Sequence, residues 1–155
     1  EGARGEGVGG GARDEVGKAG MDVDQGTGHG VGGFVSVHEG PGGISRAPAT
    51  IAVRAGMVLS SEPGFYLPGA YGIRLETLVL VREPTHTDSA RPFLEFETLT
   101  LAPFDRRLIE PTLLGEADTA LLDGYHAEIL QQIAPHLPAD AKKWLQTACA
   151  PLNKA

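Results

Sequence analysis

Between residues 30 and 104, apolar and polar positions alternate in short runs that have the period of a β-strand. The run VGGFVSVHE (31–39) places Phe34, Ser36 and His38 on one face of such a strand. The next segments, ATIAVRAG and GMVLSSEPGFY, are short and rich in β-prone residues. These patterns predict several short strands separated by glycine- and proline-rich turns.

The clearest alternation lies in YGIRLETLVLVRE (71–83). One face carries Ile73, Leu75, Thr77, Val79 and Val81, and the other carries Arg74, Glu76, Leu78 and Leu80. The connector FYLPGAYG, with Pro68 and Gly69 at its tip, predicts a hairpin. A turn centred on Gly69 brings Glu62 opposite Glu76.

The remainder of the chain changes from a strand pattern to a helix pattern. PFLEFETLTLAPF (92–104) predicts one more strand. A helical stripe follows, formed by Leu121, Leu122, Tyr125, Ile129 and Ile133. A short last helix begins with Asp140 as its N-cap and ends before Pro151. Strands followed by helices predict an α+β fold.

Composition narrows the function classes. The chain has 155 residues, 41% of them hydrophobic, which is enough for a packed core. The net charge of −7 and the absence of a Lys/Arg block argue against a nucleic-acid surface. No run of about 18 apolar residues exists, and no export signal opens the chain. Cys149 is the single cysteine, so we expect a reducing, cytoplasmic setting and no membrane partner.

The first residues differ from the rest. Residues 1–18 are glycine-rich with little apolar content, which predicts a disordered or divergent leader. The chain begins with Glu1 rather than Met. We therefore expect either that the start has been removed or that the sequence is a piece of a longer one.

Candidate chemistry gathers at one imidazole and two carboxylates. His29 lies between glycines in TGHGVG, where a tight backbone can present it to a ligand, although a solvated loop histidine is the plainer reading. Glu62 precedes Pro63, and Glu76 lies mid-strand among leucines, where Arg74 could pair with it. Together His29, Glu62 and Glu76 suit a divalent ion such as Mn²⁺ or Zn²⁺. Such an ion acidifies a bound water.

Three stretches of the chain carry a family pattern, and they are GTGHGVGGFVSVHEGPGGIS, AGMVLSSEPGFYLPGAYGIRLETLVLV and FLEFETLTLAPFDRRLIEPTLL. They closely resemble the aminopeptidase P (Xaa-Pro aminopeptidase) branch of the pita-bread metallopeptidases, family M24. The resemblance implies the C-terminal half of a pita-bread fold. It also implies an enzyme that releases the N-terminal residue from peptides with proline in second position. The last stretch resembles an extension that prolidase and creatinase lack.

The resemblance also implies roles for individual residues. Two divalent metals, usually manganese with zinc or cobalt as alternatives, are held by Asp, Asp, His, Glu and Glu in the family. The last three match His29, Glu62 and Glu76. The first glutamate also helps to activate water, and the second bridges both ions. The remaining matches contact substrate or hydrogen-bond around the site, and they are His38, Gln25, Arg74 and Tyr66.

Two departures from the family pattern qualify the expectation. The family's two aspartates lie some sixty or more residues before the histidine, whereas His29 has only 28 residues before it. We do not expect Asp14, Asp22 or Asp24 to replace them. The family motif HGTGHGVG has Gln25 in place of its first histidine here, and glutamine cannot carry a charge. We expect an incomplete metal site that neither holds two metals tightly nor cleaves peptides alone.

These observations predict three segments. Residues 1–18 form the leader, 19–90 the C-terminal half of the catalytic domain, and 91–155 an aminopeptidase P-type extension. Two hypotheses remain open: a fragment of a peptidase, or an inactive half that binds peptide or dimerises. Family resemblance implies a homodimer as the form of self-association.

Overall fold

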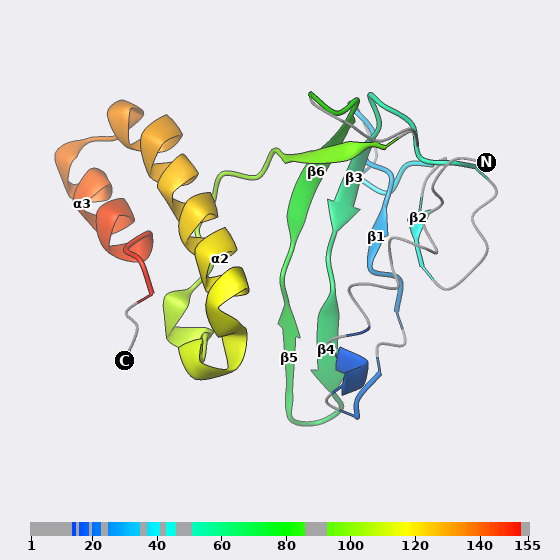
Figure 1. Cartoon of the computed structure of the whole chain (residues 1–155), viewed down its shortest axis with the longest axis horizontal. Helices are drawn as coiled ribbons and strands as arrows, with labels where there is room; N and C mark the ends of the chain where they lie inside the picture. Colours follow the sequence, from blue (N-terminus) through cyan, green and yellow to red (C-terminus); the bar gives the residue numbers. More distant parts are fainter. Residues whose placement is uncertain are drawn as a thin grey trace. The chain divides into compact units, whose positions relative to one another are not determined.

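A computed structural model describes Asp14, residues 16–18, 20–22, 25–34, 37–40, 43–45, 51–85 and 93–152. The chain divides into two compact units, Glu1–Thr100 and Leu101–Ala155, called here the N-terminal and the C-terminal unit. The first holds all the described strands and the second holds the long helices (Figure 1). The predicted α+β class is confirmed.

The N-terminal unit contains three small antiparallel sheets. The largest has the order β3-β6-β7, formed by Val58–Ser61, Thr77–Arg82 and Glu95–Thr98. A second pairs β4 with β5, and a third pairs β1 with β2. Their bounds are Gly64–Leu67, Tyr71–Arg74, Gly28–His29 and Gly43–Ile44.

Strands β3, β4, β5 and β6 form one long hairpin with a single register, which Figure 1 shows running down to a tight turn. Ser61 pairs with Thr77 and Gly64 pairs with Arg74, so the register is the same on both sides of a break. Gly69 supplies the positive φ of 76° at the turn. Glu62 therefore lies opposite Glu76, as the sequence predicted.

Strand β1 runs antiparallel beside β3. Val31 N–H donates to Val58 O at 3.0 Å, and an isolated bridge joins Gly30 to Leu59. The close approach of the two backbones requires glycine at position 28, because a Cβ there would collide with the carbonyl oxygen of Ser60. This packing brings the histidine that follows Gly28 next to the end of β3.

Each unit has its own apolar core. In the N-terminal unit it is formed by Ile44, Val53, Leu59, Val79 and Val81, with Met57 and Leu94 packed against it. Val79 and Val81 alternate on one face of β6, so the period of two in the sequence predicted this half of the core correctly. Leu59 and Val81 are each only 1% exposed.

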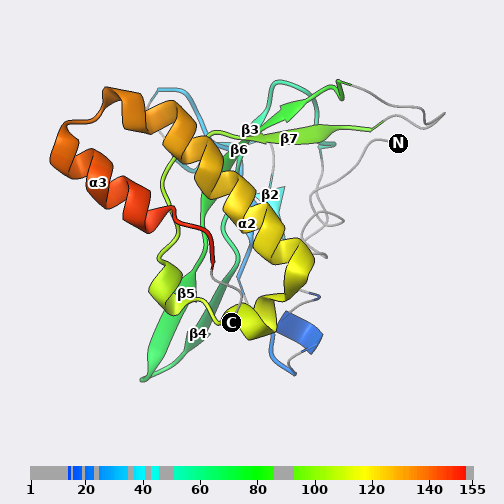
Figure 2. The same ribbon diagram turned by 60° about the vertical axis from the view of Figure 1, so that its left-hand side comes forward.

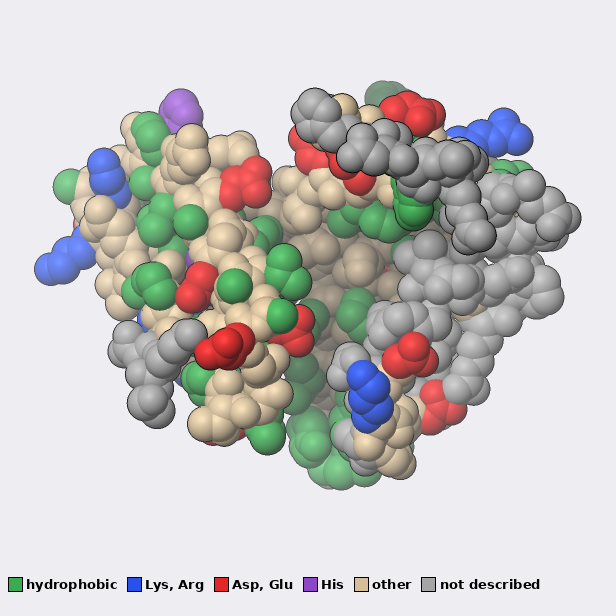
Figure 3. Space-filling model, viewed as in Figure 1, with side chains coloured by type: hydrophobic (Ala, Val, Ile, Leu, Met, Phe, Trp, Pro, Cys, Tyr) green, Lys and Arg blue, Asp and Glu red, His purple; other side chains and the backbone are tan. Residues whose placement is uncertain are grey.

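The β4–β5 hairpin is less covered. Four of its large apolar side chains are 41 to 55% exposed, and they are Tyr66, Leu67, Tyr71 and Ile73. Figure 3 shows apolar side chains gathered at the lower edge of this unit, over the turn end of the hairpin. The hairpin thus owes its order to its backbone ladder more than to burial.

The C-terminal unit consists of η1 (Arg106–Leu108), α2 (Pro111–Ile133), η2 (Ala134–His136) and α3 (Ala139–Ala148). Helices α2 and α3 lie side by side in both ribbon views (Figure 2). Ile129, Ala134, Leu145 and Cys149 form their shared core. In the described part of the chain, no helix has both the length and the apolar character needed to cross a membrane.

Three local predictions were wrong. Residues 31–34 and 37–39 form bends and irregular backbone rather than a strand, since Val31 N–H bonds to β3 and Glu39 N–H returns to Gly30 O at 2.9 Å. Residues 35 and 36 lie outside the described residues. The glycines allow this tight excursion, and the alternation there does not reflect pairing.

The other two errors concern the helices. Leu121 is 72% exposed and does not belong to the buried stripe of α2, whereas the other predicted members, Leu122, Tyr125, Ile129 and Ile133, are buried or half-buried. Thr119 and His126 are buried as well. Gly115 breaks the helical geometry near its start with a φ of 80°. Asp140 lies in the first turn of α3, whose N-cap is Pro138. Most of residues 1–18, the predicted leader, lie outside the described residues.

Candidate functional site

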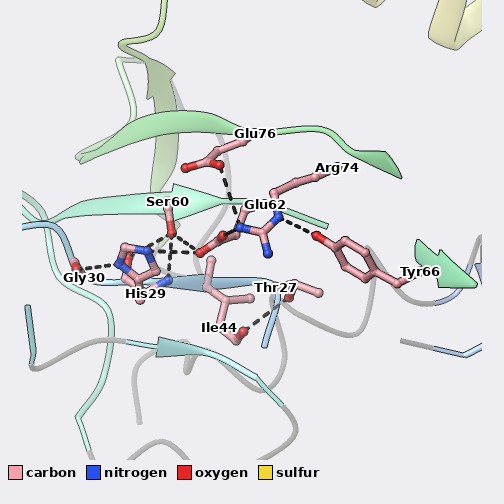
Figure 4. A network of polar contacts seen from close by, with 9 residues as sticks. All are labelled: Thr27, His29, Gly30, Ile44, Ser60, Glu62, Tyr66, Arg74 and Glu76. Carbon is pink, nitrogen blue, oxygen red and sulfur yellow. Dashed lines mark hydrogen bonds and ion pairs between the residues drawn. The ribbon is translucent and has the colours of Figure 1, made fainter. Parts of the chain in front are cut away.

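His29 and Glu62 meet where β1 passes the end of β3. Nε2 of His29 lies 3.0 Å from Oε1 of Glu62 (Figure 4). The two side chains are 21% and 10% exposed, so the pair is largely shielded from solvent. Glu62 is held there by its backbone N–H, which donates to Thr27 O at 2.8 Å. Two residues 33 positions apart in sequence are thus brought into direct contact.

The His29 ring has a fixed orientation. Its Nδ1 lies 2.8 Å from the carbonyl oxygen of Gly30. A carbonyl oxygen only accepts, so Nδ1 carries the proton and Nε2 is the nitrogen that faces Glu62. In that tautomer, the Nε2 lone pair points at a carboxylate oxygen. The space between them calls for a positive charge, either a proton or a metal ion.

The 3.0 Å spacing fits a metal ion as well as a proton. Two ligand atoms about 2.1 Å from one ion, at an angle between 90° and 109°, lie about 3.0–3.4 Å apart. Imidazole nitrogen and carboxylate oxygen are donors that Mn²⁺ and Zn²⁺ accept. The chemistry and spacing of this pair therefore fit one edge of a divalent metal site.

Arg74 lies between the two glutamates (Figure 4). Its Nη1 donates to Oε2 of Glu62 at 2.6 Å and lies 4.0 Å from Oε2 of Glu76. Its Nε donates to the hydroxyl of Tyr66 at 2.7 Å. The Tyr66 hydrogen bond and then the two carboxylates raise the pKa of the guanidinium above its ordinary value. Both carboxylates thus share one permanent cation.

Glu76 does not join His29 and Glu62 directly. It lies in the break between β5 and β6, and its side chain is 49% exposed, so the prediction of a carboxylate mid-strand among leucines was wrong. Among the described residues, no three His, Cys, Asp or Glu side chains gather closely enough to hold a metal ion. The alternative reading, an Arg74–Glu76 pair, matches the 4.0 Å separation.

The remaining predicted site residues lie on the surface around this pair. The His38 ring is stacked at a tilt on His29, with centroids 4.2 Å apart and planes at 37°. Tyr66 is 41% exposed, and Arg74 lies within 5.8 Å of its ring centroid. Gln25 is exposed. His38 thus contacts the site through His29, and Tyr66 contacts it through Arg74.

Ser60 is a polar residue at this site that the sequence reasoning missed. It is completely buried, and its hydroxyl donates to Oε1 of Glu62 at 3.0 Å. The hydroxyl oxygen of Ser60 also accepts a hydrogen bond from the backbone N–H of His29 at 2.9 Å. A signal was present in VLSSEP, because residues two apart in a strand share a face and Ser60 precedes Glu62 by two.

Comparisons with known proteins show which family the chain resembles. The sequence model of metallopeptidase family M24 matches residues 1–83, and that of the C-terminal region of peptidase M24 matches residues 92–152. Proteins named probable Xaa-Pro aminopeptidase P, from Laccaria bicolor and Colletotrichum graminicola, are 42% and 44% identical over 147 residues. That alignment covers 91% of this chain and 23% or 24% of theirs.

A solved structure agrees with the sequence relatives. The X-prolyl aminopeptidase of Caenorhabditis elegans, described as a cytosolic enzyme with a di-nuclear active site, superimposes with a TM-score of 0.90 at 39% identity. The match covers 98% of this chain and 25% of that one, so the chain spans about a quarter of its relatives' length. The resemblance inferred from the sequence and the pita-bread fold are confirmed, and the chain belongs to metallopeptidase family M24.

Proposed function

We propose that this chain is the C-terminal part of a Xaa-Pro aminopeptidase, which releases the N-terminal residue from peptides with proline in second position. The observation that carries the proposal is the contact between His29 Nε2 and Glu62 Oε1 at 3.0 Å. It occurs in a chain more than 40% identical to proteins of that name. A histidine in a solvated loop would meet a carboxylate in this way only by chance, so the contact favours a functional site.

In this proposal His29, Glu62 and Glu76 supply three of the ligands of two divalent ions, with manganese as the first choice. The di-nuclear active site described for the C. elegans relative supports the number two. When bound, such ions lower the pKa of a coordinated water and polarise the peptide carbonyl. The two aspartates of the family pattern must come from elsewhere in the protein.

The chain's own residues have distinct tasks. Gly30 O holds the His29 ring with Nε2 toward Glu62, and Glu62 accepts a proton from the attacking water. Arg74 places its positive charge beside both glutamates, and Tyr66 limits the rotation of its guanidinium. We assign to His38, which stacks on His29, the contact with the substrate and the stabilisation of the tetrahedral intermediate. Gln25 completes the substrate contacts with neutral hydrogen bonds.

The wider assignments are part of the same proposal. We propose residues 19–90 as catalytic and 91–155 as an extension, which the gap between the two family matches, at residues 84–91, supports. A cytoplasmic location is supported by the description of the C. elegans relative as cytosolic. The names of the relatives, which are aminopeptidases, support a peptide as the partner. A homodimer remains the expected assembly.

A chimaera tests the function. This chain replaces the matching quarter of the C. elegans X-prolyl aminopeptidase, and release of the N-terminal residue from a Gly-Pro peptide is followed with Mn²⁺ present. We expect hydrolysis of the proline peptide and none of a Gly-Ala control. His29→Ala should reduce kcat by at least about a thousandfold, since it removes a metal ligand.

Two results would contradict the assignment. A folded chimaera that binds Mn²⁺ but leaves the Gly-Pro peptide intact would favour the inactive, peptide-binding module. Full turnover by the His29→Ala chimaera would show that the site has been placed on the wrong residues. Circular dichroism of each chimaera separates these results from misfolding.

A further inference from the structure

Ser60 interrupts the backbone ladder between β1 and β3. The bonds Val31 N–H to Val58 O and Glu62 N–H to Thr27 O fix the register, and they place His29 directly across from Ser60. A regular antiparallel pair at this position would join the His29 N–H to the Ser60 backbone carbonyl. Instead, the His29 N–H donates to the Ser60 hydroxyl at 2.9 Å.

The Ser60 hydroxyl connects the backbone nitrogen of His29 with the carboxylate of Glu62. It accepts from the backbone of His29 and donates to Oε1 of Glu62 at 3.0 Å, the same oxygen that faces His29 Nε2 (Figure 4). A serine hydroxyl has one donor and two acceptor positions, so both bonds form at once. Ser60 is 0% exposed, and water does not compete for either bond.

These contacts leave Glu62 little freedom. Oε1 accepts from Ser60, and Oε2 accepts from Arg74 at 2.6 Å. Each oxygen therefore has a fixed partner on a different side, and the plane of the carboxylate is set. Removing Arg74 leaves the bond between Ser60 and Oε1 in place, whereas removing the Ser60 hydroxyl takes away a hydrogen bond of Oε1 and the bond of the His29 N–H.

We propose that Ser60 is a positioning residue for the metal ligands His29 and Glu62. It binds no ion itself and holds the two ligand atoms 3.0 Å apart by fixing one backbone and one carboxylate. This inference rests on the proposed function, because it concerns the same metal site. Hydrogen-bond partners of ligands elsewhere change metal affinity by about 10- to 100-fold when they are removed.

The test uses the chain itself with Mn²⁺ as the probe. Paramagnetic broadening of the His29 ring protons in NMR spectra reports how much Mn²⁺ is needed for half effect, even where binding is weak. We expect Ser60→Ala to require at least about tenfold more Mn²⁺. Ser60→Thr keeps a hydroxyl that can hold both ligands, so the Mn²⁺ concentration for half effect should remain within about threefold of the parent value.

Ser61→Ala is the matched control. It removes a hydroxyl from the adjacent residue of β3 on the other face, so it should leave the Mn²⁺ response unchanged. Should Ser60→Ala fail to fold, Ser60→Thr decides the matter, with a tenfold loss there overturning the proposal. Hydrogen exchange of the His29 amide gives a second readout without metal, and it should accelerate in Ser60→Ala only.

The outcomes separate the two inferences. Folded Ser60→Ala that responds to Mn²⁺ like the parent overturns the role of Ser60 and leaves the proposed function standing. If the His29 ring of the parent chain shows no Mn²⁺ effect, the same titration is made on the chimaera, where the two aspartates are present, and equal responses with and without Ser60→Ala there overturn the role of Ser60. Equal losses in Ser60→Ala and Ser61→Ala would mean that general loosening of β3, and no specific hydroxyl, is responsible.

Discussion

Glu62 and Glu76 face the same nitrogen, Nη1 of Arg74, from opposite strands of one hairpin. Like charges directly across a strand pair are destabilising, and a shared guanidinium removes that repulsion. A divalent ion could do the same with more charge. The hairpin therefore holds its two carboxylates together through the guanidinium of its own Arg74.

Arg74→Gln should make the fold dependent on an added cation. Without the guanidinium the two carboxylates repel, so the unfolding midpoint should fall at low salt and recover when Mn²⁺ is added. The parent should gain less from Mn²⁺ because Arg74 already neutralises the pair. Thermal unfolding followed by circular dichroism, at several Mn²⁺ concentrations, measures both effects.

Arg82→Gln is the control for Arg74. Arg82 pairs with Glu97 across β6 and β7, on the exposed surface of the same unit. Exposed ion pairs contribute little, so the midpoint should barely change and Mn²⁺ should give no extra recovery. Equal Mn²⁺ rescue of both variants would mean that the ion screens charge generally and does not replace Arg74.

Gly28→Ala should separate β1 from β3. The new Cβ meets the backbone carbonyl of Ser60, which cannot rotate away, so the strand must shift. Overpacking of this kind costs about 1–3 kcal/mol, and here it also pulls His29 away from Glu62. Gly43→Ala, on the partner strand β2, meets only Gly28 O at 3.9 Å and should be tolerated. Urea unfolding curves compare the two, and equal losses would contradict this account.

Ile129→Ala and Leu121→Ala together test which predicted positions of α2 are buried. Ile129 is 0% exposed in the core of the C-terminal unit, so removing its side chain should cost about 2–5 kcal/mol. Leu121→Ala, at a position the sequence pattern placed on the same stripe, should change stability by less than about 0.5 kcal/mol because Leu121 is 72% exposed. The helical circular dichroism signal during urea unfolding measures both losses of stability. A larger loss for Leu121→Ala than for Ile129→Ala would mean that Leu121 is part of the buried stripe.

His126 should make the C-terminal unit sensitive to acid. It is 0% exposed, and its Nε2 accepts the Phe104 N–H at 3.2 Å, so burial and then the nearby Arg106 charge lower its pKa. Below about pH 6.5 the unfolded chain binds a proton that the folded chain resists. The free energy of unfolding should therefore fall as the pH drops from 7 through that window.

The pH effect has a direct control. His126→Gln removes the titrating ring and offers an oxygen to Phe104 N–H, so it should lower stability at pH 7 yet flatten the dependence on pH between 7 and 5.5. His136→Gln, at an exposed position in η2, should keep the parent's slope. A slope that survives in His126→Gln would assign the acid sensitivity to another group.

The sequence predicted what depends on short-range rules. The turn at Gly69 and the alternation through Val79 and Val81 fix the hairpin, and the hairpin fixes Glu62 across from Glu76. The family resemblance assigned His29 and Glu62 to one metal site, and the two side chains lie in contact, while the assignment itself stays a prediction. In each case one local pattern, or one known arrangement, was sufficient.

What the sequence did not predict depends on tertiary contacts. The run around Phe34 alternates like a strand, yet the Gly30 carbonyl is bonded by Glu39 N–H, and the chain folds back. Leu121 has the period of a core residue, but Thr119 and His126 occupy the buried side of α2. Ser60 was missed because a small polar residue in a strand looks unremarkable until its neighbours across the ladder are known.

Because the long hairpin has one register, the number of residues in its turn determines whether Glu62 and Glu76 lie opposite each other. Adding or deleting one residue between Leu67 and Tyr71 would slide one strand past the other by a step, and Glu76 would turn to the opposite side of the sheet from Glu62. A loop that touches neither carboxylate thus dictates whether they can ever share an ion, and its length is under as much constraint as the acids themselves.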